Sequence, residues 1–168
     1  MRGGSDGRAN VYLLSDMQVV SPFPQSGSTP FMTDPLRVFL VEDSPVIRER
    51  LTETISSIEH VEVAGFAETE SDAIAGLKAA PYDAVVLDLQ LKEGHGFNVL
   101  KALRKDSAKP RVTVLVLTNY ATQQYRGRSM EFGADYFFDK SREYDRLCEV
   151  LEELVGRRGP ASDHQGAS

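Results

Sequence analysis

From Leu36 onward, short apolar runs alternate with segments whose apolar residues recur at helical spacing. Apolar runs of this length are typical of strands that are buried on both faces of a parallel sheet. The predicted strands are residues 36–41, 61–66, 82–87, 112–117 and 134–138. The predicted helices are residues 45–59, 71–80, a stretch marked by Phe97, Leu100 and Leu103, residues 121–132, and residues 143–155.

Five strands that alternate with five helices predict an α/β fold. The expected architecture is a doubly wound, five-stranded parallel sheet with helices on both faces, a three-layer sandwich joined by right-handed crossovers. The flavodoxin-like strand order 2-1-3-4-5 is the commonest arrangement of this size.

The length of 168 residues favours one domain with additional terminal segments. Residues 1–34 are rich in Gly, Ser and Pro and are predicted to be a mobile extension, in which Met32 is a second possible start. Residues 35–158 are predicted to form the folded domain, and residues 159–168 a disordered tail.

Composition excludes several classes of function. The net charge of −6 argues against a general nucleic-acid surface, so no DNA partner is expected. The single cysteine rules out an intramolecular disulfide and a cysteine-based metal cluster. No run approaches the roughly 18 apolar residues of a membrane span, and no signal-peptide pattern is seen. We therefore expect a cytoplasmic protein without membrane insertion.

Chemically capable side chains follow the predicted strands. Carboxylates come after the first strand (Glu42 and Asp43) and the third (Asp88), while Thr118 and Lys140 follow the fourth and fifth. Ligands bind at the carboxyl ends of the strands in open α/β sheets. If the first and third strands are adjacent, three carboxylates share one pocket and repel one another unless a cation neutralises them. Oxygen ligands without histidine or thiol favour Mg²⁺, or Mn²⁺ in its place.

Together these groups predict a phosphoryl-transfer site. Asp88 would be a carboxylate nucleophile, Lys140 and the cation would neutralise the transferring group, and Thr118 would hydrogen-bond a phosphoryl oxygen. Each residue also has an ordinary explanation, since Asp commonly opens a turn and a loop Lys is usually solvated. Their joint occurrence at successive strand ends favours the site.

Residues 35–157 resemble the receiver domain of bacterial two-component response regulators. The motifs that carry the resemblance are Glu42-Asp43, Leu87-Asp88 with Gly96 eight residues later, Thr118, and Gly133-Ala134 leading to Lys140. The resemblance implies that Asp88 is the phosphoacceptor and that Lys140 pairs with it or with its phosphate. It also implies that Mg²⁺ is bound by Asp43 and Asp88 directly, by Glu42 directly or through water, and by the backbone carbonyl of Gln90.

The same resemblance implies a conformational switch. Thr118 and Phe137 would couple phosphorylation to the face formed by the fourth helix, fifth strand and fifth helix. The expected partners are a histidine kinase or phosphotransfer protein, and a downstream protein that binds this face. The protein is expected to be a monomer or a weak homodimer.

Some positions depart from the family pattern. Lys92 replaces a usual proline four residues after Asp88, so this loop is expected to be looser, and Ser141 replaces the usual proline after the lysine. Asn119 stands where a small residue is usual and would narrow access to Asp88. Lys92, Asn119 and the neighbouring Tyr120 are therefore predicted to modulate the site.

About ten residues follow Arg158, so we expect a stand-alone response regulator that is not an enzyme. One alternative is a Mg²⁺-dependent aspartyl phosphatase, but such enzymes usually carry a second Asp where this chain has Gln90. The other alternative is a receiver-like scaffold or dimerisation module that is not phosphorylated.

Overall fold

The computed structural model describes residues 34–107 and 109–158. The predicted extension up to residue 33 and the predicted tail 159–168 lie outside these residues. The strands are β1 (Leu36–Val41), β2 (Val61–Ala67), β3 (Ala84–Leu87), β4 (Thr113–Thr118) and β5 (Tyr136–Asp139). The helices are α2 (Pro45–Ser56), α3 (Glu70–Ala79), α4 (Gly96–Lys105), α5 (Gln123–Glu131) and α6 (Tyr144–Arg157).

All five strands are parallel and lie in the order β2-β1-β3-β4-β5, which confirms the predicted α/β fold and its flavodoxin-like topology. The order reverses between β1 and β3, where Val41 pairs with Leu87. Asp88, the residue that follows β3, donates its backbone N–H to the carbonyl of Val41 at 3.0 Å. The acidic residues that follow β1 and β3 therefore leave the sheet side by side.

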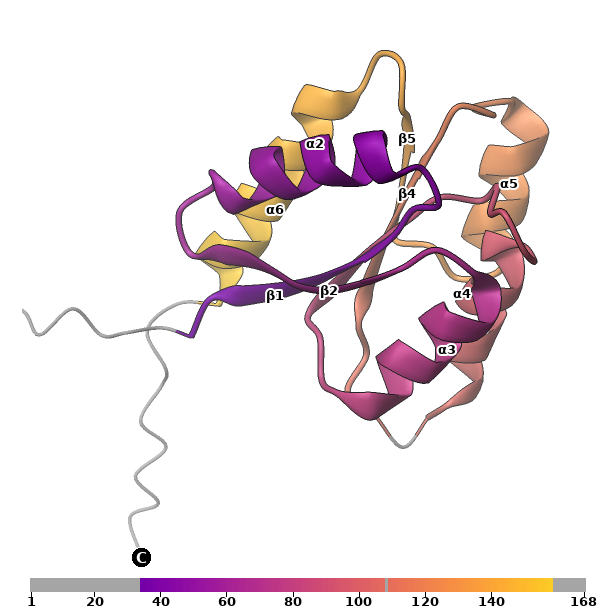
Figure 1. Cartoon of the computed structure of the whole chain (residues 1–168), viewed down its shortest axis with the longest axis horizontal. Helices are drawn as coiled ribbons and strands as arrows, with labels where there is room; N and C mark the ends of the chain where they lie inside the picture. Colours follow the sequence, from indigo (N-terminus) through magenta and orange to yellow (C-terminus); the bar gives the residue numbers. More distant parts are fainter. Residues whose placement is uncertain (1–33, 108, 159–168) are drawn as a thin grey trace, which may run out of the picture. The chain divides into compact units, whose positions relative to one another are not determined.

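The central strands β1, β3 and β4 are buried on both faces because helices cover both (Figure 1). Phe39 and Val41 of β1 pack with the inner faces of α3 and α4. Val38 and Leu40, which point the opposite way, pack with α2 and α6. This is the expected three-layer sandwich, and it explains why the strands read as continuous apolar runs.

The polar start of α2 lies beside the acidic residues. Ser44 accepts a hydrogen bond from the backbone N–H of Ile47 at 3.5 Å, and Pro45 occupies the first turn, where its missing N–H costs nothing. The helix ends at Ser56, three residues before the predicted end. The N–H of Ile58 turns back to the carbonyl of Ile55, and His60 has a φ of +61°.

Two strands, β3 and β5, begin two residues later than predicted, and each follows an aspartate whose carboxylate binds the backbone N–H of a neighbouring strand. Before β3, the Asp83 carboxylate accepts the N–H of Arg37 at 2.8 Å. Before β5, the Asp135 carboxylate accepts the N–H of Val114 and the guanidinium of Arg104, each at 2.8 Å. Both carboxylates thus tie the amino ends of neighbouring strands together.

Among the residues that the structure describes, none of the helices has the length and apolar character needed to cross a membrane.

Candidate functional site

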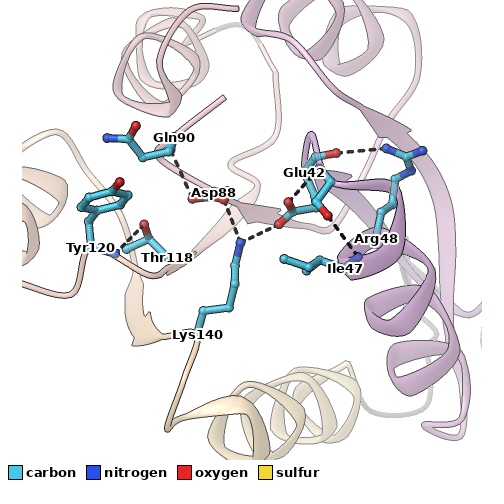
Figure 2. Close-up of polar contacts among 9 residues, drawn as sticks. Glu42, Ile47, Arg48, Asp88, Gln90, Thr118, Tyr120 and Lys140 are labelled. Atoms are coloured by element: carbon cyan, nitrogen blue, oxygen red, sulfur yellow. Dashed lines mark hydrogen bonds and ion pairs between the residues drawn. The ribbon is translucent and has the colours of Figure 1, made fainter. Parts of the chain in front are cut away.

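The strand ends bring Glu42, Asp88 and Lys140 into direct contact (Figure 2). The Nζ atom of Lys140 lies 2.7 Å from Oδ2 of Asp88 and 2.6 Å from Oε2 of Glu42. All three side chains are buried, with exposed fractions of 6% for Lys140, 9% for Asp88 and 3% for Glu42. One ammonium therefore bridges carboxylates that belong to two different strands.

Asp43 completes an acidic cluster at this edge of the sheet. One carboxylate oxygen from each of Glu42, Asp43 and Asp88 can be chosen so that all three lie within 4.8 Å of one another. Three carboxylates and one ammonium leave a formal charge of −2. Oxygen donors at this spacing, with an uncompensated charge of this size, suit a hard divalent cation such as Mg²⁺.

At both Glu42 and Lys140, burial and ion pairing act on the pKa in opposite directions. Burial raises the pKa of Glu42 above its ordinary value, although the hydrogen bond and charge of Lys140 act against this. Burial alone would lower the pKa of Lys140, but the charges and hydrogen bonds of Asp88 and Glu42 outweigh it and raise that pKa. Lys140 is therefore held as a cation.

The start of α2 fixes the orientation of Glu42. Its Oε1 accepts the backbone N–H of Ser44 at 3.0 Å while Oε2 faces Lys140. Arg48 donates to the Glu42 carbonyl at 3.2 Å and pairs with Glu68 at 2.8 Å. Both carboxylate oxygens of Glu42 are thus engaged by the protein itself.

The loop between β3 and α4 wraps closely around Asp88. The Gln90 N–H donates to Oδ1 of Asp88 at 3.2 Å, and the Gly96 N–H donates to the carbonyl of Leu89 at 3.0 Å. A Cβ atom at Gly96 would lie 2.3 Å from the Asp88 carbonyl, so no larger residue fits there without a backbone shift. Lys92 lies exposed in this loop and forms no ion pair with any described carboxylate.

The predicted switch residues are both buried. Thr118 is fully buried, and its Oγ1 accepts the N–H of Tyr120 at 3.2 Å, while Asn119 and Tyr120 are exposed. Phe137 already lies in the core, with 4% exposed. The guanidinium of Arg126 stacks over its ring at 4.7 Å and donates to its carbonyl at 3.1 Å.

Sequence patterns did not indicate the roles of Arg126 and Glu70. Arg126 also pairs with Glu143 at 3.6 Å, and Glu143 in turn accepts the N–H of Asp139 at 2.8 Å. Glu70, at the start of α3, accepts hydrogen bonds from residues after β3. The one signal that could have indicated Glu70 is an acidic residue next to a helix start, and such a residue is usually explained by the helix dipole.

Comparison with known proteins gives a consistent result. Residues 38–152 match the family model of the response regulator receiver domain. A protein-glutamate methylesterase/protein-glutamine glutaminase of Myxococcus xanthus is 37% identical over 128 residues, which are 75% of this chain and 36% of that protein. The chain spans no more than 60% of the length of further curated relatives.

Solved structures share the fold. The signal receiver domain of the response regulator NarL from Mycobacterium tuberculosis is 26% identical with a TM-score of 0.65, and the match covers 74% of this chain and 99% of that one. The receiver domain of the sensor histidine kinase PA1611 from Pseudomonas aeruginosa is 23% identical with a TM-score of 0.63, over 73% of this chain and 98% of that one. That second structure has a magnesium ion coordinated in its active site cleft.

Proposed function

This chain belongs to the response regulator receiver domain family, and we propose that Asp88 accepts a phosphoryl group from a phosphohistidine. The donor would be a histidine kinase or a phosphotransfer protein. The observation that carries the proposal is the bridge from Lys140 to both Asp88 and Glu42, next to the third carboxylate of Asp43. These are the charges that a carboxylate nucleophile and a transferring phosphoryl group require.

In the transfer, a carboxylate oxygen of Asp88 forms a bond to phosphorus as the phosphorus–nitrogen bond to the donor imidazole breaks. The imidazole nitrogen keeps the electron pair of that bond. Lys140 remains protonated, because its pKa is raised, and its ammonium neutralises negative charge on the acceptor and then on the phosphoryl oxygens.

The residues present fit a magnesium ion. Asp43, Asp88 and the backbone carbonyl of Gln90 would hold it directly. Glu42, whose two oxygens accept hydrogen bonds from Ser44 and Lys140, would hold it directly or through a water molecule. When bound, the ion would neutralise charge between the acceptor carboxylate and the phosphoryl group. The magnesium ion in the cleft of the Pseudomonas receiver domain supports this assignment.

Phosphorylation would be transmitted through Thr118. A phosphoryl group adds about −1.5 to −2 charges at neutral pH, and the Thr118 hydroxyl would leave the Tyr120 N–H to donate to it. The ring of Phe137 and the Arg126 stacked on it would respond on the face formed by α5, β5 and α6. We propose that a downstream protein binds this face, and that Lys92, Asn119 and Tyr120 modulate access to Asp88.

The test is phosphoryl uptake from acetyl phosphate with and without Mg²⁺, for the wild type and for Asp88→Asn. The wild type should take up phosphate only with Mg²⁺, and Asp88→Asn should take up none. Asp43→Asn should need far more Mg²⁺ than the wild type. Uptake by Asp88→Asn equal to that of the wild type would refute the assignment. If a downstream partner binds Asp88→Ala as well as it binds the phosphorylated wild type, the chain would instead be a scaffold module.

A further inference from the structure

Glu70 fastens the loop that follows β3 to the start of α3. Its Oε2 accepts the backbone N–H of His95 at 2.9 Å and the side-chain amide of Asn98 at 3.0 Å. The backbone N–H of Glu70 also donates to the carbonyl of Glu93 at 3.0 Å. Three hydrogen bonds therefore join this one residue to the loop and to the first turn of α4, which lies beside α3 (Figure 1).

Gly94 lets the loop approach this closely. Its φ is +85°, in the left-handed region that favours glycine. A Cβ atom there would lie 2.4 Å from both Cβ and Oε2 of Glu70. The loop backbone thus lies directly against the Glu70 side chain, with no room for a side chain at position 94.

The fastening reaches the acidic site through a short connection. His95, which donates to Glu70, forms an isolated antiparallel β-bridge with Gln90. Gln90 in turn donates its N–H to Asp88 Oδ1 at 3.2 Å. The backbone of Gln90 is therefore held on one side by Asp88 and on the other by the segment that Glu70 anchors.

From this connection we infer that Glu70 is a positioning residue for divalent-cation binding. The inference rests on the proposed function, in which the Gln90 carbonyl is a cation ligand. Glu70 touches neither the cation nor Asp88. It would limit the motion of the β-bridged loop, so that the Gln90 carbonyl is already in place when the cation arrives. It would replace the stiffness expected from a proline at position 92, where this chain has Lys92.

A purely electrostatic role for Glu70 can be separated from this positioning role. Any nearby carboxylate attracts a cation through space, and Glu93 in the same loop carries the same charge on an exposed side chain. Glu93→Gln therefore removes one charge from the loop and keeps the three hydrogen bonds of Glu70. Glu70→Ala removes one charge together with both side-chain hydrogen bonds.

The experiment is a calorimetric titration of the full chain with MgCl₂ in the absence of any phosphodonor. Loss of groups that orient metal ligands typically weakens binding about 10- to 100-fold. Because Glu70 acts through the loop, we expect Glu70→Ala to weaken Mg²⁺ binding by about tenfold, the lower end of that range. Gly94→Ala, which retains Glu70 but forces the loop away, should weaken binding similarly, whereas Glu93→Gln should match the wild type.

A second readout is amide hydrogen exchange of residues 90–98 in Mg²⁺-free protein. Exchange should be faster in Glu70→Ala than in the wild type, and saturating Mg²⁺ should reverse most of the difference. Equal Mg²⁺ affinities of Glu70→Ala and the wild type would overturn the inference, as would an equal loss in Glu93→Gln. If the wild type itself binds no Mg²⁺, the proposed function fails rather than the role of Glu70 alone.

Discussion

Replacing Lys140 with Met tests how strongly this ammonium stabilises the acidic cluster. Methionine keeps much of the length and apolar stem of the side chain but removes the charge. The carboxylates of Glu42 and Asp88, with side chains 3% and 9% exposed, then lose their common cationic partner. The free energy of unfolding should fall, because buried negative charges are left without a counter-charge.

The magnitude follows from the contacts that remain. Breaking a buried ion pair by removing one partner costs about 3–5 kcal/mol. We expect the lower end, about 3 kcal/mol, because the N–H groups of Ser44 and Gln90 still donate to the two carboxylates. In a domain of this size the loss corresponds to a fall in Tm of about 10 °C.

Magnesium should reverse much of this loss. A ligand present at about 100 times its Kd stabilises the folded state by about 2.7 kcal/mol. Without Lys140 the cluster carries a formal charge of −3 instead of −2, so the variant should bind Mg²⁺ more tightly than the wild type does. The same Mg²⁺ concentration should therefore stabilise Lys140→Met more than the wild type.

Urea denaturation followed by circular dichroism, in EDTA and in MgCl₂, measures both effects. Lys78→Met is the matched control, since Lys78 is exposed on α3 and the change should stay within about 0.5 kcal/mol. If Lys140→Met unfolds at the same urea concentration as the wild type in EDTA, the account of charge neutralisation at this site is wrong.

Three further outcomes are expected. The pKa of Glu42 is raised in the folded state, so the folded state binds the Glu42 proton more tightly than the unfolded state does. In EDTA the free energy of unfolding should therefore fall as pH rises from the unfolded-state pKa of Glu42 through its folded-state pKa. Glu42→Gln should flatten that part of the pH profile, which urea denaturation measures. Arg126→Gln should cost about 1 kcal/mol and speed rotamer exchange of the Phe137 ring, measured by methyl and aromatic NMR. Gly96→Ala should cost about 2 kcal/mol or more and slow phosphoryl uptake, because its Cβ would collide with the Asp88 carbonyl.

The sequence predicted the fold and the central part of the site for one physical reason. Buried parallel strands read as continuous apolar runs, and the residues just after them lie at one edge of the sheet. Asp88, Thr118 and Lys140 could therefore be grouped before any contact was known. The distances between these side chains depend on the order of β1, β3, β4 and β5 in the sheet. The periodicity of the sequence does not determine that order.

The pattern of apolar residues in the sequence could not predict contacts between side chains and loops. Glu70 meets His95 and Asn98 only because α3 and α4 lie next to each other in the fold, and nothing in their spacing of about 25 residues indicates this. The same holds for Asp135, whose carboxylate binds Arg104 and Val114 from other elements. The substitution at Lys92 predicted a looser loop, but no sequence pattern indicated the hydrogen bonds that join this loop to Asp88 and Glu70.

The chemical identity of the phosphorylated residue tests the central claim most directly. Borohydride reduces an acyl phosphate on aspartate to homoserine, which peptide mass spectrometry locates in the chain. After incubation with acetyl phosphate and Mg²⁺, homoserine should be found at position 88, and omission of Mg²⁺ should abolish it. Homoserine at another aspartate, or phosphate that resists borohydride because it is bound to a hydroxyl or an imidazole, would contradict the account.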